Sequence, residues 1–108
     1  MDLSDDFLMA RVARGDSAAF ETIYDRHAAI VLGVLLQVTG ARARAEDILQ
    51  ETFWKVWQDA AAYSQQRGTF TSWILRIARS LAIQAQNAEQ MAIAVTVTEK
   101  PSRNLGQK

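Results

Sequence analysis

The sequence predicts an all-α protein, a small bundle of about four helices followed by a disordered C-terminal tail. Apolar residues recur at spacings of three and four along most of the chain, as amphipathic helices require. No alternation of strands and helices appears. The segment AIAVTVT at 92–98 has some strand propensity but no second strand to pair with. We therefore expect a helical domain at residues 1–91 and a linker or disordered tail at 92–108.

The first helix is expected to run from Ser4 or Asp5 to Arg14, because a polar cap precedes it and Gly15 follows it. Its expected apolar contacts are Phe7, Leu8, Val12 and Met9.

The second helix is expected to run from a cap at Asp16 or Ser17 to Thr39, before Gly40. Its predicted core face holds Phe20, Tyr24, His27, Val31, Val34, Leu35 and Val38. Leu32 and Leu36 lie on the opposite side, which suggests that this half of the helix is buried between neighbours. Because no catalytic partners are visible, His27 is interpreted as a packed, hydrogen-bonded core residue.

The third helix is expected from about Arg44 to Ala62, with a core arc of Leu49, Phe53, Val56, Trp57 and Ala60. The segment YSQQRGT, from Tyr63 to Thr69, breaks the pattern with polar residues and Gly68. The fourth helix is expected from Phe70 or Thr71 to about Ala88 or Met91. Its apolar stripe is Phe70, Trp73, Ile74, Ile77 and Leu81.

Composition excludes several classes of protein. The 108 residues include no cysteine and one histidine, so we expect neither a disulfide framework nor a zinc site, and no cofactor. No apolar run approaches the ~20 residues that span a membrane. The acidic start MDLSDDF lacks the basic residues of a secretory signal, which favours a cytosolic protein. We find no phosphate-binding loop, zinc-protease motif or catalytic triad, and expect no enzyme.

The net charge of zero conceals an asymmetry. Residues 1–59 carry 10 acidic and 6 basic side chains, a balance of −4, whereas residues 60–108 carry 2 acidic and 6 basic ones, a balance of +4. Such a chain could meet a basic partner at its front and an acidic one, such as nucleic acid, at its back. Alternatively, three of the basic residues lie in a disordered tail and do not mark a binding surface.

One face of the third helix suits the docking of another protein. Asp47, Glu51 and Gln58 lie in a narrow arc opposite the core arc, and this polar arc is flanked by Gln50 and Trp54. The aromatic ring would supply contact area, while the acids orient a basic partner. The alternative is that Trp54 tucks under the first helix and the acids are a solvated surface.

The loop and fourth helix combine arginines with aromatics, which hints at single-stranded nucleic acid. Arginine contacts phosphates, and aromatic rings hold unstacked bases. The arginines are Arg67, Arg76 and Arg79, and the aromatics are Tyr63, Phe70 and Trp73. The alternative is that Phe70, Trp73 and Ile77 serve the core of a small bundle.

Three segments together resemble region two of bacterial RNA polymerase sigma factors of the extracytoplasmic-function (ECF) group. They are FETIYDRHAAIV, AEDILQETFWKVW and RGTFTSWILRIARSLAI, in the order of the family, and the resemblance as a whole covers about Leu8 to Ile83. The resemblance implies that Asp47, Gln50 and Glu51 dock on the clamp helices of the polymerase's largest subunit, and we add Trp54 to this docking surface from its position beside them. It implies that the segment from Tyr63 to Ser80 reads the −10 promoter element and captures a flipped base of the non-template strand.

The resemblance leaves a second function open. The family usually continues its IAR run with Asn, an aspartate and two or more arginines, whereas this chain has Ser80, Gln84 and an uncharged stretch, Ala85 to Ala88. About twenty residues follow Glu89, so the family's −35-reading module is not in this sequence. The alternative is an interaction module that binds polymerase or an anti-sigma protein but has lost promoter reading.

Overall fold

The computed structural model describes the backbone of residues 3–106 and the side chains of residues 3–93. The chain folds into α1 (Asp5–Val12), α2 (Ser17–Thr39), α3 (Arg42–Gln58) and α4 (Phe70–Gly106), with short 3₁₀ turns η1 (Ala60–Ala62) and η2 (Gln65–Arg67) between α3 and α4. The described residues contain no strand, which confirms the prediction of an all-α bundle.

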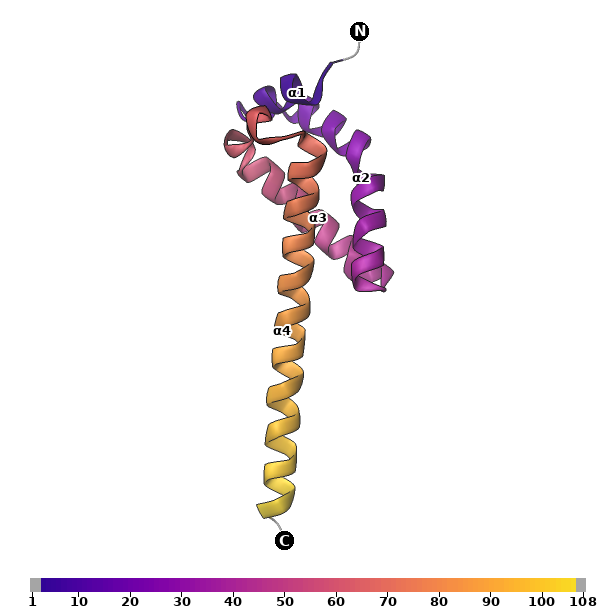
Figure 1. The fold of residues 1–108 in the computed structure, drawn as a ribbon, viewed down its shortest axis with the longest axis vertical. Helices are drawn as coiled ribbons and strands as arrows, with labels where there is room; N and C mark the ends of the chain where they lie inside the picture. The colour runs from indigo at the N-terminus through magenta and orange to yellow at the C-terminus, as the bar shows by residue number, and fades with distance from the viewer. Residues whose placement is uncertain (1–2, 107–108) are drawn as a thin grey trace.

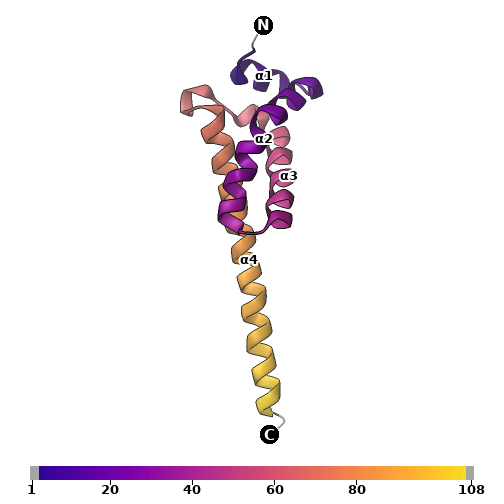
Figure 2. The same cartoon turned by 90° about the vertical axis from the view of Figure 1, so that its right-hand side faces the viewer.

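The helix α2 is central to the bundle, because α1, α3 and α4 all pack against it. α3 runs back beside α2, α4 packs against both, and α1 lies across one end of the bundle (Figures 1 and 2). The molecule measures 73 × 23 × 23 Å because α4 continues far beyond the other helices (Figure 1).

The helix ends form where the capping residues predict. The Ser4 hydroxyl accepts a hydrogen bond from the Phe7 N–H at 3.1 Å, and Oδ1 of Asp16 accepts one from the Ala19 N–H at 3.1 Å. The Ala19 N–H and then the Arg11 side chain lower the pKa of Asp16. Gly40 ends α2 with φ of +70°, in the left-handed region that glycine adopts without strain. α1 ends slightly early, at Val12.

The buried faces differ in part from the predicted ones. Phe7 is 48% exposed, and α1 instead buries Leu8, Met9 and Val12. In α2 the most buried series is Ala19, Ile23, His27, Val31 and Leu35. Because α2 packs against several helices at once, two of its adjacent faces are covered. The spacing of apolar residues in the sequence did not show which of the two faces is more deeply buried. Phe20 and Tyr24 lie at its edge, against the ring of Phe53 on α3.

Two boundaries moved in the second half of the chain. α3 ends at Gln58, and the residues from Ala60 to Ala62 that we had assigned to it form the turn η1. α4 begins at Phe70 as expected but continues past Met91 to Gly106. Residues 84–92 are rich in alanine and glutamine, which are good helix formers, so no local signal ends the helix at Met91. The division into a domain at 1–91 and a linker at 92–108 stays a prediction.

Candidate nucleic-acid and protein interfaces

The α3–α4 loop, residues 59–69, projects from the end of the bundle where α1 lies (Figure 1). Its two turns are short, and its residues from Gln65 to Thr69 are exposed. Gly68 has φ of +134°, and an added Cβ there would lie 3.1 Å from the Ser72 hydroxyl oxygen, so only glycine fits without strain. The Thr69 hydroxyl then accepts a hydrogen bond from the Ser72 N–H at 3.1 Å and caps α4.

An aromatic cluster anchors both ends of this loop. The rings of Tyr63, Phe70 and Trp73 lie 5.3 to 5.7 Å apart, centroid to centroid. Phe70 is only 2% exposed, so its ring supports the cluster from within and is not available at the surface. Tyr63 and Trp73 are half-buried and retain surface. Phe70 is therefore a core residue, as the alternative interpretation expected, whereas the rings of Tyr63 and Trp73 are packed on one side and exposed on the other.

His27 has the structural role that the sequence indicated. Its side chain is buried, its Nε2 lies 2.9 Å from Oδ2 of Asp5, and its ring packs 4.8 Å from that of Phe70. The other carboxylate oxygen of Asp5 accepts a hydrogen bond from Arg26 at 3.1 Å. The imidazole therefore ties α1 to α2 beneath the start of α4.

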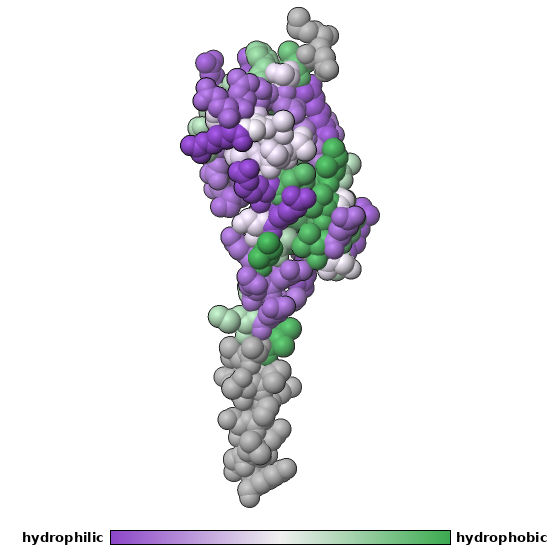
Figure 3. Space-filling model, viewed as in Figure 1, coloured by the Kyte–Doolittle hydropathy of each residue, from purple (hydrophilic) through white to green (hydrophobic). Residues whose placement is uncertain are grey.

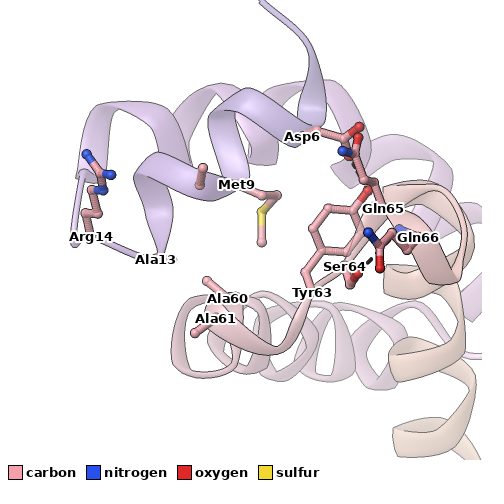
Figure 4. A pocket seen from close by; sticks show the side chains of 11 residues that line it. Asp6, Met9, Ala13, Arg14, Ala60, Ala61, Tyr63, Ser64, Gln65 and Gln66 are labelled. Carbon is pink, nitrogen blue, oxygen red and sulfur yellow. Dashed lines mark hydrogen bonds between the residues drawn. The ribbon is translucent and has the colours of Figure 1, made fainter.

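A hydrogen bond from Tyr63 also connects the loop to α1. The tyrosine hydroxyl donates this hydrogen bond to Oδ1 of Asp6. Partial burial, followed by this hydrogen bond and the charges of Asp6 and Asp5, raises the pKa of Tyr63 to about 12. The segments of α1 and the loop border an open cleft of about 590 Å³, with Met9 between them and the Asp6–Tyr63 pair at one end (Figure 4).

The predicted DNA-binding side chains gather over the loop and the first turns of α4. Arg67, Arg76 and Trp73 line a hollow of about 70 Å³ together with Ser64, Thr69 and Ser72. Arg76 also lines a shallow groove along α4, together with Arg79 and Ser80. This end of the molecule is mostly hydrophilic, whereas a hydrophobic patch lies further along α2 beside α4 (Figure 3).

Our residue-by-residue predictions missed the hydroxyl groups of the hollow and the two aspartates of α1. Thr69 directly precedes the fourth helix, so its capping position was a usable signal. Asp5 and Asp6 gave no such signal for a role near the loop, because acids in the first turn of a helix are common in their own right.

The predicted docking residues form an exposed surface on α3. Asp47, Gln50, Glu51 and Trp54 are all exposed, and Trp54 is 58% exposed. The alternative in which Trp54 tucks under the first helix is therefore wrong. Gln50 and Trp54 also border a mostly apolar groove of about 450 Å³, whose other walls are Ser17, Phe20, Tyr24, Phe53 and Trp57.

The part of the chain that the structure describes shows neither a metal-binding cluster nor a membrane-spanning helix. Within it, no group of three or more histidine or acidic side chains is placed to hold a metal ion. Over the same residues, no helix combines the length and the hydropathy needed to cross a bilayer.

Residues 23–90 match the sequence model of the family described as Sigma-70 region 2. The chain belongs to this family. It is similar to ECF RNA polymerase sigma factor SigK of Mycolicibacterium vanbaalenii, with 33% identity over 81% of this chain and 44% of the relative. It is also similar to ECF RNA polymerase sigma factor SigL of Mycobacterium tuberculosis, with 30% identity over 85% of this chain and 54% of the relative. The chain thus spans about half the length of these curated relatives.

A solved structure supports the same assignment for this ECF region-two domain. An engineered region 2 of sigmaE, determined by NMR in complex with GTAAAA, matches with a TM-score of 0.74 and 27% identity. The match covers 83% of this chain and 95% of that one. The family match begins at Ile23 and so contains both candidate surfaces but not α1.

Proposed function

We propose that this region-two domain serves transcription initiation by binding core RNA polymerase and the non-template strand of a −10 promoter element. The observation that carries the proposal is the hollow beside Gly68, where two arginines, an aromatic ring and three hydroxyl groups converge. The similar engineered sigmaE region 2 was solved in complex with GTAAAA, which supports a short strand as the ligand.

DNA would lie over the loop and along the first turns of α4. The exposed guanidinium groups of Arg67, Arg76 and Arg79 would contact phosphates and fix the register of the strand. One unstacked base would enter the hollow, where hydroxyl groups offer hydrogen bonds and the Trp73 ring offers a stacking face. Phe70 and Tyr63 would support this surface from beneath and beside it. Capture of a flipped base would lower the free energy of the opened duplex, and the domain itself would perform no covalent chemistry.

Polymerase would dock on the α3 surface, which we define as Asp47, Gln50, Glu51 and Trp54. The two carboxylates suit a basic partner helix, and Trp54 supplies the exposed aromatic area typical of an interface centre. By family resemblance the partner is the pair of clamp helices in the largest subunit. The α3 surface and the hollow lie on different elements, so one domain can bind both partners.

The second candidate is an interaction module that keeps the fold but no longer reads promoters. It is favoured by one observation: α4 carries no arginine or lysine between Ser80 and Ile93. Each missing phosphate contact weakens DNA binding and reduces its salt dependence. Such a module would occupy polymerase or an anti-sigma protein through the α3 surface.

The deciding experiment is fluorescence anisotropy of a labelled GTAAAA strand titrated with the domain, in the presence and absence of bacterial core polymerase. Strands of the same composition in another order serve as controls, at two salt concentrations. Sequence-dependent binding that polymerase strengthens would support promoter reading. Polymerase binding with equal affinity for all strands would favour the interaction module. No engagement with either partner would contradict both functions.

A further inference from the structure

The α3–α4 loop is built from two short 3₁₀ turns, each held by local backbone hydrogen bonds. Within it, the Arg67 N–H donates to the Ser64 carbonyl at 3.0 Å and the Gly68 N–H to that of Gln65 at 3.2 Å. These are single 3₁₀ turns with exposed side chains, a kind of segment that opens readily on its own. If the hollow is to select one base, contacts from outside the loop must hold these turns in place.

Those contacts come from the first turn of α1. Asp6 accepts a hydrogen bond from Tyr63 at the start of the loop, and Asp5 binds His27 in the core of α2. The His27 ring packs on Phe70, which packs on Tyr63. The five side chains therefore form a continuous chain of contacts that connects α1, α2, the loop and the start of α4.

The arrangement makes Asp6 the bridge across a cleft. Figure 4 shows Asp6 and Tyr63 close together at one end of the cleft, with Arg14 at the other end. The Tyr63 ring packs against the rings of Phe70 and Trp73. A charge-assisted hydrogen bond to the hydroxyl fixes the ring's position along the cleft.

We propose that Asp6 is a positioning residue for DNA recognition: by holding Tyr63 it sets the position of the loop, and thereby the shape of the hollow beside Gly68. This inference rests on the proposed function. It assigns a role to α1, which lies outside the region-two match at residues 23–90. Asp6 does not line the hollow and would act on DNA only through Tyr63.

The test uses Asp6→Ala, Tyr63→Phe and the double variant, with Asp25→Ala as a matched control that removes an exposed carboxylate from α2. Two quantities are measured. One, without DNA, is the hydrogen-exchange rate of the Arg67 and Gly68 amides. The other, with polymerase present, is the ratio of affinities for GTAAAA and a reordered strand.

Each single variant should speed loop exchange and reduce the affinity ratio by about tenfold, a change typical of losing a hydrogen bond to a charged group. The double variant should be no worse than either single one, because both remove the same bond. Asp6→Asn, which keeps an acceptor oxygen without the charge, should restore part of both quantities. The Asp25→Ala control should match the unmodified protein.

Exchange and affinity ratios in Asp6→Ala equal to those of the control, even with a lower thermal midpoint, would overturn the inference and leave Asp6 a merely stabilising residue. If the unmodified protein prefers no strand, the proposed function fails instead. Loop exchange alone then decides whether Asp6 positions the loop.

Discussion

Arg44, in the first turn of α3, forms an ion pair with Glu89, 45 residues later on α4. Close by, the Gln86 side-chain amide donates a hydrogen bond to the Val38 carbonyl near the end of α2, at 3.0 Å. Both contacts join α4 to the end of the bundle opposite the loop. The helix that carries the candidate DNA-binding arginines is therefore fixed at both ends of the bundle.

This ion pair predicts a small dependence of stability on acid. Arg44, through its hydrogen bond, lowers the pKa of Glu89 from the ordinary value of 4.5. The pair therefore stabilises the fold above that value, and its contribution is lost as the pH falls through the lowered pKa. Urea unfolding should show Glu89→Gln slightly less stable than the unmodified protein at pH 7, and this difference in the free energy of unfolding should shrink as the pH falls below 4.5. Added salt should narrow it at pH 7. A gap unchanged by acid would contradict the role of the charge.

Reversing the charge of Glu51 should weaken polymerase binding. Glu51→Arg places a cation in the middle of the α3 surface, where a basic partner helix would be repelled. Circular dichroism should show unchanged helicity, because the side chain is exposed. Pull-down or titration with core polymerase measures the effect, and Glu21→Arg on α2 is the matched control. Equal affinity of both variants would remove the docking assignment.

Removing two arginines from α4 should weaken DNA binding and its salt dependence together. On single-stranded DNA each phosphate contact contributes about 0.7 units to the slope of log affinity against log salt concentration. The double change Arg76→Ala, Arg79→Ala should therefore flatten the slope by up to about 1.4 units. The same anisotropy titration, repeated over a series of salt concentrations, provides the measurement. An unchanged slope would place the strand elsewhere.

Truncation of Ile74 should destabilise the bundle strongly. Its side chain is fully buried on α4, and Ile→Ala changes in cores cost about 2–5 kcal/mol in free energy of unfolding. Ile83, 53% exposed on the same helix, is the control, and its change to alanine should cost no more than about 0.5 kcal/mol. Chemical denaturation of both variants measures the difference. Similar losses at the two positions would mean that α4 packs by another face.

Local signals in the sequence predicted the local features of the fold. The caps at Ser4 and Asp16 and the turn at Gly40 depend on side chains a few residues away, so a reading of neighbours suffices. The choice of buried face is less local. Phe7 fits an apolar stripe by spacing, yet the position of α1 leaves it exposed, and only the packed structure decides this.

The candidate site divides in the same way. The arginines and the glycine of the loop are visible in the sequence, and the structure brings Arg67 and Arg76 to one hollow. The pairing of Asp6 with Tyr63 spans 57 positions, and no periodicity connects residues so far apart. Phe70 shows the converse difficulty: an aromatic next to a basic loop has the same sequence signature whether it faces a base or the core.

The backbone at Gly68 has a consequence for chirality. With φ of +134° and ψ of −176°, this residue adopts the mirror image of an ordinary extended conformation. An L-amino acid is strained there, but a D-amino acid would find its own preferred geometry. A semisynthetic domain with D-alanine at this position should keep the loop and lose less entropy on folding than glycine does. The same position with L-alanine should distort the loop, so handedness at one atom would decide whether the hollow forms.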